Sequence, residues 1–116
     1  MNPEELKQRT KIFALRIIKF VGSLPKTRVA FILGDQLLRA GTSVGANYRS
    51  ACRARSRADF VSKIEVVEEE TDESLYWMEL LIESKIVSFE TLAELYSEGK
   101  ELLAIFVSSG KTAKNP

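Results

Sequence analysis

Arginine side chains gather in the middle of this sequence, where together they could hold a chain of phosphates. Arg49, Arg53, Arg55 and Arg57 follow one another closely, and Arg39 precedes them. A guanidinium group keeps its charge and donates several hydrogen bonds in one plane, which suits phosphate oxygens. No aromatic residue lies between Arg49 and Arg57, so stacking on bases is not indicated. The predicted nucleic-acid-binding residues are Arg39, Arg49, Arg53, Arg55, Arg57 and Lys63.

Carboxylates form the second group of side chains that could do chemistry. They recur between Glu65 and Glu83 on one side of an amphipathic pattern, with no glycine turn among them. Paired carboxylates can transfer protons or bind metal ions. At this regular helical spacing we interpret them instead as a solvated face, or as partners for arginines. We therefore expect no metal site and no cofactor.

The chain contains no histidine and one cysteine, Cys52. This composition excludes histidine-based acid–base catalysis, Ser-His-Asp and Cys-His arrangements, and histidine-containing zinc sites. An internal disulfide is excluded as well. We expect a protein that is not an enzyme. Because no signal peptide or membrane span is recognisable, a cytoplasmic location is the default expectation, with no membrane partner.

Charge divides unevenly along the chain, although the net charge is only +1. Through Lys63 there are 13 Lys or Arg residues against 4 Asp or Glu, a net charge of +9. From Ile64 onward there are 4 against 12, a net charge of −8. Such asymmetry favours either a basic surface for an anionic partner or helices that pair by charge within or between subunits.

The elements that must position these residues are helical. Apolar residues recur at spacings of three and four along four segments, and Asn2-Pro3, Ser56 and Ser88 are typical helix starts. Ser56 and Asp59 match a capping box. Gly110 is the expected C-cap of the last helix. The predicted fold is all-α, an antiparallel up-down four-helix bundle in a single domain 1–116, with helices at about 3–22, 27–52, 57–85 and 89–109 and a tail at 110–116.

Three glycines, Gly34, Gly41 and Gly45, form a stripe on the second predicted helix. Each costs about 0.8–1 kcal/mol relative to alanine inside a helix, so the stripe needs a reason. Close helix–helix packing is the favoured interpretation, and a backbone exposed to a ligand phosphate is the alternative. No Gly-Lys-Ser/Thr follows, so this is not a phosphate loop. Gly34 could also kink the helix or divide it in two.

Several runs of residues resemble one bacterial family, the four-helix-bundle proteins named for ribosomal-RNA intervening sequences. These runs are Gln36-Leu37-Leu38-Arg39, Ser43-Val44-Gly45-Ala46-Asn47-Tyr48-Arg49, Ala58-Asp59-Phe60 and the segment from Glu69 to Trp77. The resemblance extends from about Lys7 to Phe106. The family includes the accessory variability determinant of diversity-generating retroelements. It implies an up-down bundle that assembles as a pentameric ring. For the retroelement members it also implies binding to nucleic acid and to a reverse transcriptase.

Two functional hypotheses follow. The first is a homo-oligomeric binding module, expected to be a pentamer, that contacts an RNA or DNA backbone through its arginine-rich surface. The glycine stripe supports an oligomer here because it gives the second helix more than one face for packing. The alternative is a structural assembly or protein-interaction bundle whose arginines pair with acidic helices of neighbouring subunits, without binding nucleic acid.

Overall fold

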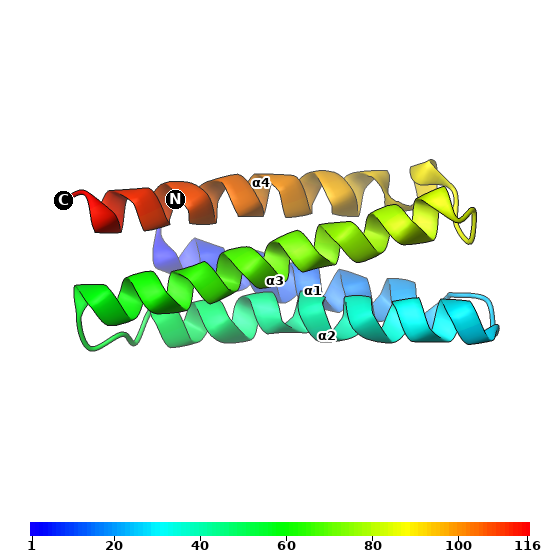
Figure 1. The fold of residues 1–116 in the computed structure, drawn as a ribbon, viewed down its shortest axis with the longest axis horizontal. Coiled ribbons are helices and arrows are strands. Elements are labelled where there is room, and N and C mark those ends of the chain that lie inside the picture. The colour runs from blue at the N-terminus through cyan, green and yellow to red at the C-terminus, as the bar shows by residue number, and fades with distance from the viewer.

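Four α-helices account for nearly the whole chain in the computed structural model, which describes residues 1–116. They are α1 (Pro3–Gly22), α2 (Arg28–Ala51), α3 (Arg57–Glu83) and α4 (Phe89–Lys114). Successive helices run in opposite directions, and the turns alternate between the two ends of an elongated bundle of 46 × 20 × 20 Å (Figure 1). The predicted antiparallel up-down four-helix bundle is confirmed.

Each helix begins at a side chain that satisfies a free backbone amide of the first turn. Asn2 accepts a hydrogen bond from the Glu5 amide at 2.8 Å, and Ser56 accepts one from the Asp59 amide at 3.0 Å. Ser88 accepts a hydrogen bond from the Thr91 amide at 3.4 Å. These three predicted helix starts are therefore confirmed. None of the four helices combines the length and the apolar character needed to cross a membrane.

The helix ends differ from the sequence prediction, most of all in α4. This helix continues to Lys114, so the expected tail at 110–116 is mostly helical and Gly110 is not its C-cap. The reason is packing against α3. A Cβ atom on Gly110 would lie 2.8 Å from a Glu68 carboxylate oxygen, and Lys114 forms an ion pair with Glu65 at 3.2 Å. Contacts with α3 therefore hold the last turns of α4 in place.

The bounds of α2 and α3 also differ from the sequence prediction. Thr27 and Cys52 are caps of α2 rather than its first and last residues, and the helix runs through Gly34 without a break. α3 ends at Glu83 instead of residue 85, because Lys85 adopts a left-handed conformation with φ of 64°. A helix cannot continue through that conformation.

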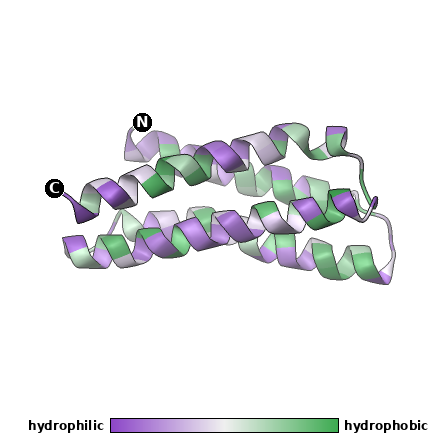
Figure 2. Cartoon of the chain, turned by 45° about the horizontal axis from the view of Figure 1, so that its top comes forward, coloured by the Kyte–Doolittle hydropathy of each residue, from purple (hydrophilic) through white to green (hydrophobic).

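The core lies along the centre of the bundle and draws on all four helices. Hydrophobic and hydrophilic residues alternate along each ribbon in Figure 2, as amphipathic helices require. Thr71, a polar interruption of the α3 pattern, is fully buried and donates its hydroxyl hydrogen to the Val67 carbonyl. The largest almost completely buried side chains are Phe13, Ile17, Leu37, Ile64, Met78, Leu81, Leu92, Leu102 and Phe106.

The four seams between neighbouring helices are not equally close. α2 packs extensively on α1 and on α3, and α3 packs extensively on α4, whereas α1 approaches α4 at few places. Ion pairs on the surface span this looser seam: Arg9 donates to Glu98 at 2.9 Å, and Arg16 lies 3.8 Å from Glu94. The pKa of Arg9 is raised, chiefly by its hydrogen bond to Glu98. α1 and α3 are not neighbouring helices and occupy opposite corners of the bundle.

Candidate nucleic-acid interface

A groove of about 460 Å³ lies between α1 and α2, near the start of α1 and the end of α2. Small residues form its floor, namely Ala14 on α1 with Gly45 and Ala46 on α2. A Cβ atom on Gly45 would lie 3.1 Å from the Thr10 hydroxyl, and one on Gly41 would overlap the Ile17 side chain. The glycines thus allow α1 to approach α2 closely within one chain. The face that they form is occupied by α1, so it does not supply a surface for another subunit.

Four cationic side chains line this groove, two from each of its sides. Lys7 and Lys11 come from α1, Arg49 comes from the last turn of α2, and Arg53 lies in the turn just after that helix. Residues four apart lie on the same side of a helix and about 6 Å apart along its axis. Since α1 and α2 are antiparallel, the beginning of one helix meets the end of the other. The two pairs therefore face a common groove from opposite rims.

Three of these four cations are free to meet an anion. Lys7 is the exception, since it contacts Glu4 at 3.1 Å, and Glu4 also lines the groove. No carboxylate of the chain lies within 4.0 Å of the Lys11 amine or of the Arg49 and Arg53 guanidinium groups. All three residues are exposed. An exposed, unpaired guanidinium group can bind a phosphate without first breaking an ion pair.

The hydroxyl groups in the groove donate their hydrogens elsewhere. Thr10 donates to the Leu6 carbonyl at 2.9 Å, and Thr42 donates to the Leu38 carbonyl at 2.7 Å. Both bonds lie within a single helix. An anion in the groove would consequently be held by the cations on its rims rather than by the hydroxyl groups of its floor. Contacts of that kind recognise a backbone and carry no base specificity.

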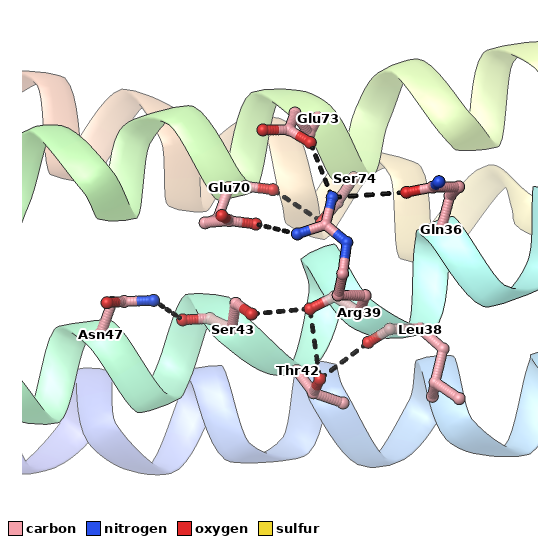
Figure 3. A network of polar contacts seen from close by, with 9 residues as sticks. All are labelled: Gln36, Leu38, Arg39, Thr42, Ser43, Asn47, Glu70, Glu73 and Ser74. Carbon is pink, nitrogen blue, oxygen red and sulfur yellow. Dashed lines mark hydrogen bonds and ion pairs between the residues drawn. The ribbon is translucent and has the colours of Figure 1, made fainter.

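Arg39 lies away from this groove, on the side of α2 that faces α3. Figure 3 shows its side chain reaching across to Glu70 and Glu73 on α3. One guanidinium nitrogen is 3.1 Å from Glu73, and another is 3.9 Å from Glu70. Helical periodicity in the sequence predicts that Arg39 shares one stripe with Arg49 and Arg53. In the folded chain this arginine belongs to a polar network between two helices, and its charge is already paired.

The remaining predicted residues lie in or after the turn between α2 and α3. Lys63 is paired with Asp59 at 3.2 Å. Asp59 also accepts a hydrogen bond from the Arg55 amide at 3.0 Å, and this bond, followed by Lys63, lowers the pKa of Asp59. The Arg55 and Arg57 side chains are exposed and have no carboxylate within 4.0 Å. They follow Arg53 directly along the chain and extend the basic end of the bundle.

Lys7 and Lys11 were not among the predicted site residues, although the sequence contains a signal for them. Their spacing of four places both on one side of the first helix. An antiparallel hairpin of the first two helices then brings that helix's start beside Arg49 and Arg53. Neither observation alone identifies the lysines, because the rotation of α1 about its axis decides which neighbour they face.

The carboxylate of Glu70 is the least well satisfied charged group of the seam between α2 and α3. Its side chain is 16% exposed, and one oxygen has no hydrogen-bond partner. Burial raises the pKa of Glu70, the nearby Glu73 raises it further, and Arg39 opposes both effects. The Glu65 and Glu73 side chains on the same helix are more exposed, at 48% and 44%. No three Cys, Asp or Glu side chains are grouped so that they could hold a metal ion.

Glu70→Gln is expected to gain stability relative to the wild type as the pH rises from about 4 to about 7. A group whose pKa is raised by folding favours the native state most below its unfolded pKa of about 4.3, and this contribution is lost as the pH rises through the folded value. Glutamine has no charge to bury at any pH. Urea unfolding of both proteins across this range measures the effect. Glu90→Gln, at an exposed carboxylate in the first turn of α4, is the control. A constant difference between Glu70→Gln and wild type would contradict the assignment.

Comparisons with known proteins give one family. Residues 4–108 match the model described as 23S rRNA-intervening sequence protein. A crystal structure from Bacteroides thetaiotaomicron VPI-5482, of a protein with unknown function from the S23 ribosomal protein family, superposes with a TM-score of 0.88. It is 34% identical, and the match covers 96% of this chain and 99% of that one. No curated protein matches the sequence.

Proposed function

The chain belongs to the family of 23S rRNA-intervening sequence proteins, and from this premise we propose that it is a non-enzymatic, homo-oligomeric module that binds a nucleic-acid backbone in the groove between α1 and α2. The observation that carries the proposal is the convergence of Lys7, Lys11, Arg49 and Arg53 on one groove. Three of these four cations have no carboxylate partner within the chain. Arg55 and Arg57 add further positive charge next to the groove.

The chemistry of the groove favours backbone contacts without base recognition. Its lining contains no aromatic side chain on which a base could stack. Lysine and arginine bind phosphate through charge, which is the same in every sequence. The expected ligand is therefore an RNA or DNA strand or duplex of arbitrary sequence. The family's name refers to ribosomal RNA, which makes RNA the first ligand to test.

An oligomer strengthens such binding without any new kind of interaction. In a ring, the basic groove would be repeated by the symmetry, and one nucleic-acid molecule could contact several grooves. Each further groove would then be occupied at the high effective concentration set by the first. We expect a pentamer, as the resemblance to ring-forming relatives implies.

Binding is expected to weaken steeply with salt. Each phosphate that the protein neutralises releases counterions, so the logarithm of the association constant should fall linearly with the logarithm of salt concentration. The slope is about −0.9 for each phosphate on duplex DNA and about −0.7 on a single strand. Titrations of labelled RNA and DNA of equal length, at low and moderate salt, measure affinity and slope together. Absence of binding even at low salt would contradict the proposal.

The second candidate is assembly through charge pairing between subunits. It is favoured by carboxylates on the outer face of α3, among them Glu69, Asp72 and Glu83, which are exposed and have no cation within 4.0 Å. If the arginines of the groove met these carboxylates in a neighbouring copy, little positive charge would remain for nucleic acid. The wild type would then fail to bind at low salt, and removal of the arginines would dissociate the oligomer.

A further inference from the structure

The outer face of α1 is unusually apolar for a surface helix. Ile12, Leu15 and Ile18 are 47%, 57% and 48% exposed, whereas Phe13 and Ile17 on the opposite side are fully buried. A helix that packs on one core normally presents polar residues to water on its other side. Three large aliphatic side chains within two turns form a contiguous exposed patch, and such patches typically mark an interaction surface.

Positive charge accompanies this patch. Lys19 is exposed and lies on the stripe of Ile12 and Leu15, because the three residues are separated by three and four positions. No carboxylate of the chain lies within 4.0 Å of its amine. A partner for this face should therefore present apolar side chains together with negative charge.

The outer face of α3 has that character. Tyr76 is 53% exposed and forms an edge-on pair with Trp77, with the ring centroids 5.2 Å apart. Exposed carboxylates surround it on the same helix, including Glu69, Asp72 and Glu83. Residues 69, 72, 76 and 83 differ by three, four and seven, so all four share one side of α3. The apolar residues and the charge of this side complement those of α1.

We infer that the outer face of α1 in one copy packs on the outer face of α3 in a second copy. The inference deepens the proposed function, since it rests on the protein being a homo-oligomer and names the surfaces that join its subunits. Because α1 and α3 occupy opposite corners of the bundle, each copy uses two different surfaces. Such a heterologous interface passes from copy to copy, and it forms a ring when the rotation between copies closes, as the proposed pentamer requires. The arginines Arg49 and Arg53 lie outside both surfaces.

Light scattering behind size exclusion tests the two surfaces separately. The wild type is expected to be an oligomer. Leu15→Gln/Ile18→Gln removes the apolar patch of α1. Glu69→Lys/Tyr76→Ser reverses a charge on the α3 face and removes its exposed ring. Each variant is expected to have the mass of a single chain, 13.0 kDa. All four positions are exposed, so circular dichroism should show that both variants remain folded. Phe89→Gln, at a side chain 57% exposed at the start of α4, is the control and should keep the wild-type mass.

Mixing the two variants gives the sharper result. Each retains the surface that the other lacks, so an equimolar mixture should form a dimer containing one copy of each. If the α1 faces of two copies packed on each other instead, the mixture would form no such mixed dimer. Persistence of the oligomer in either variant, or failure of the mixture to associate, would overturn the assignment of these surfaces. A monomeric wild type would overturn the proposed oligomer itself, so the two failures are distinguishable.

Discussion

Arg49→Ala/Arg53→Ala is expected to bind nucleic acid about 10- to 100-fold more weakly than the wild type at low salt. Each hydrogen bond to a phosphate on an exposed surface contributes about 0.7–1.4 kcal/mol, and the double variant removes two of them from each groove. The slope of log affinity against log salt should become shallower by about one for each phosphate that is no longer neutralised. Fluorescence anisotropy with labelled RNA at several salt concentrations measures both quantities.

Arg39→Ala is the matched control for this experiment. Arg39 lies on α2, as Arg49 does, but its guanidinium group is paired with Glu73 and Glu70 on α3. Its removal should leave the affinity within about twofold of the wild type, as expected for a side chain that binds no phosphate. An equal loss of affinity in both variants would mean that the groove is not the binding site. A fall in oligomer mass in Arg49→Ala/Arg53→Ala would instead support charge pairing between subunits.

Phe13→Ala is expected to lower the free energy of unfolding by about 3–5 kcal/mol. The ring is fully buried and lies against Gly99 of α4, where a Cβ atom would be 3.5 Å from two ring carbons. It fills the space between α1 and α4, the neighbouring helices that otherwise pack least closely. Alanine would leave a cavity that neither helix can close without moving as a whole.

Chemical unfolding monitored by circular dichroism measures this destabilisation. Phe89→Ala is the control, because that side chain is more than half exposed and its removal should change stability by no more than about 0.5 kcal/mol. A destabilisation of less than about 1 kcal/mol in Phe13→Ala would show that the space between α1 and α4 collapses or was never closely packed.

The sequence predicted the helices well because their starts are encoded locally. Asn2, Ser56 and Ser88 each bond to an amide three residues ahead, so no distant residue is needed to recognise them. The end of α4 is set differently. Gly110 resembles a C-cap in the sequence, yet packing against Ile64 and Glu68 on α3 holds it inside the helix. Such tertiary interactions override a local stop signal and are not visible in a single sequence.

Only part of the candidate site could be predicted, because tertiary packing also decides which residues meet there. Periodicity predicts that Arg39, Arg49 and Arg53 lie on one stripe of the second helix, although in the structure Arg53 follows the end of α2. Whether a residue of that stripe faces a groove or an acidic neighbour depends on the register and rotation of the adjoining helices. For Arg39 the deciding residues are Glu70 and Glu73, more than thirty positions away. For the groove they are Lys7 and Lys11, which the turn between α1 and α2 brings back to the end of α2.

The sparse packing between α1 and α4 has a consequence for folding kinetics. The three extensive seams join helices that follow one another in the chain, so most native interactions are local in sequence. Bundles of this kind fold within about microseconds to milliseconds, because little loop entropy must be given up before the helices meet.

The same arrangement of helices predicts which backbone amides are best protected from hydrogen exchange. α1 and α4 can each detach by breaking one extensive seam, whereas α2 and α3 are each held by two, and their amide protons exchange last.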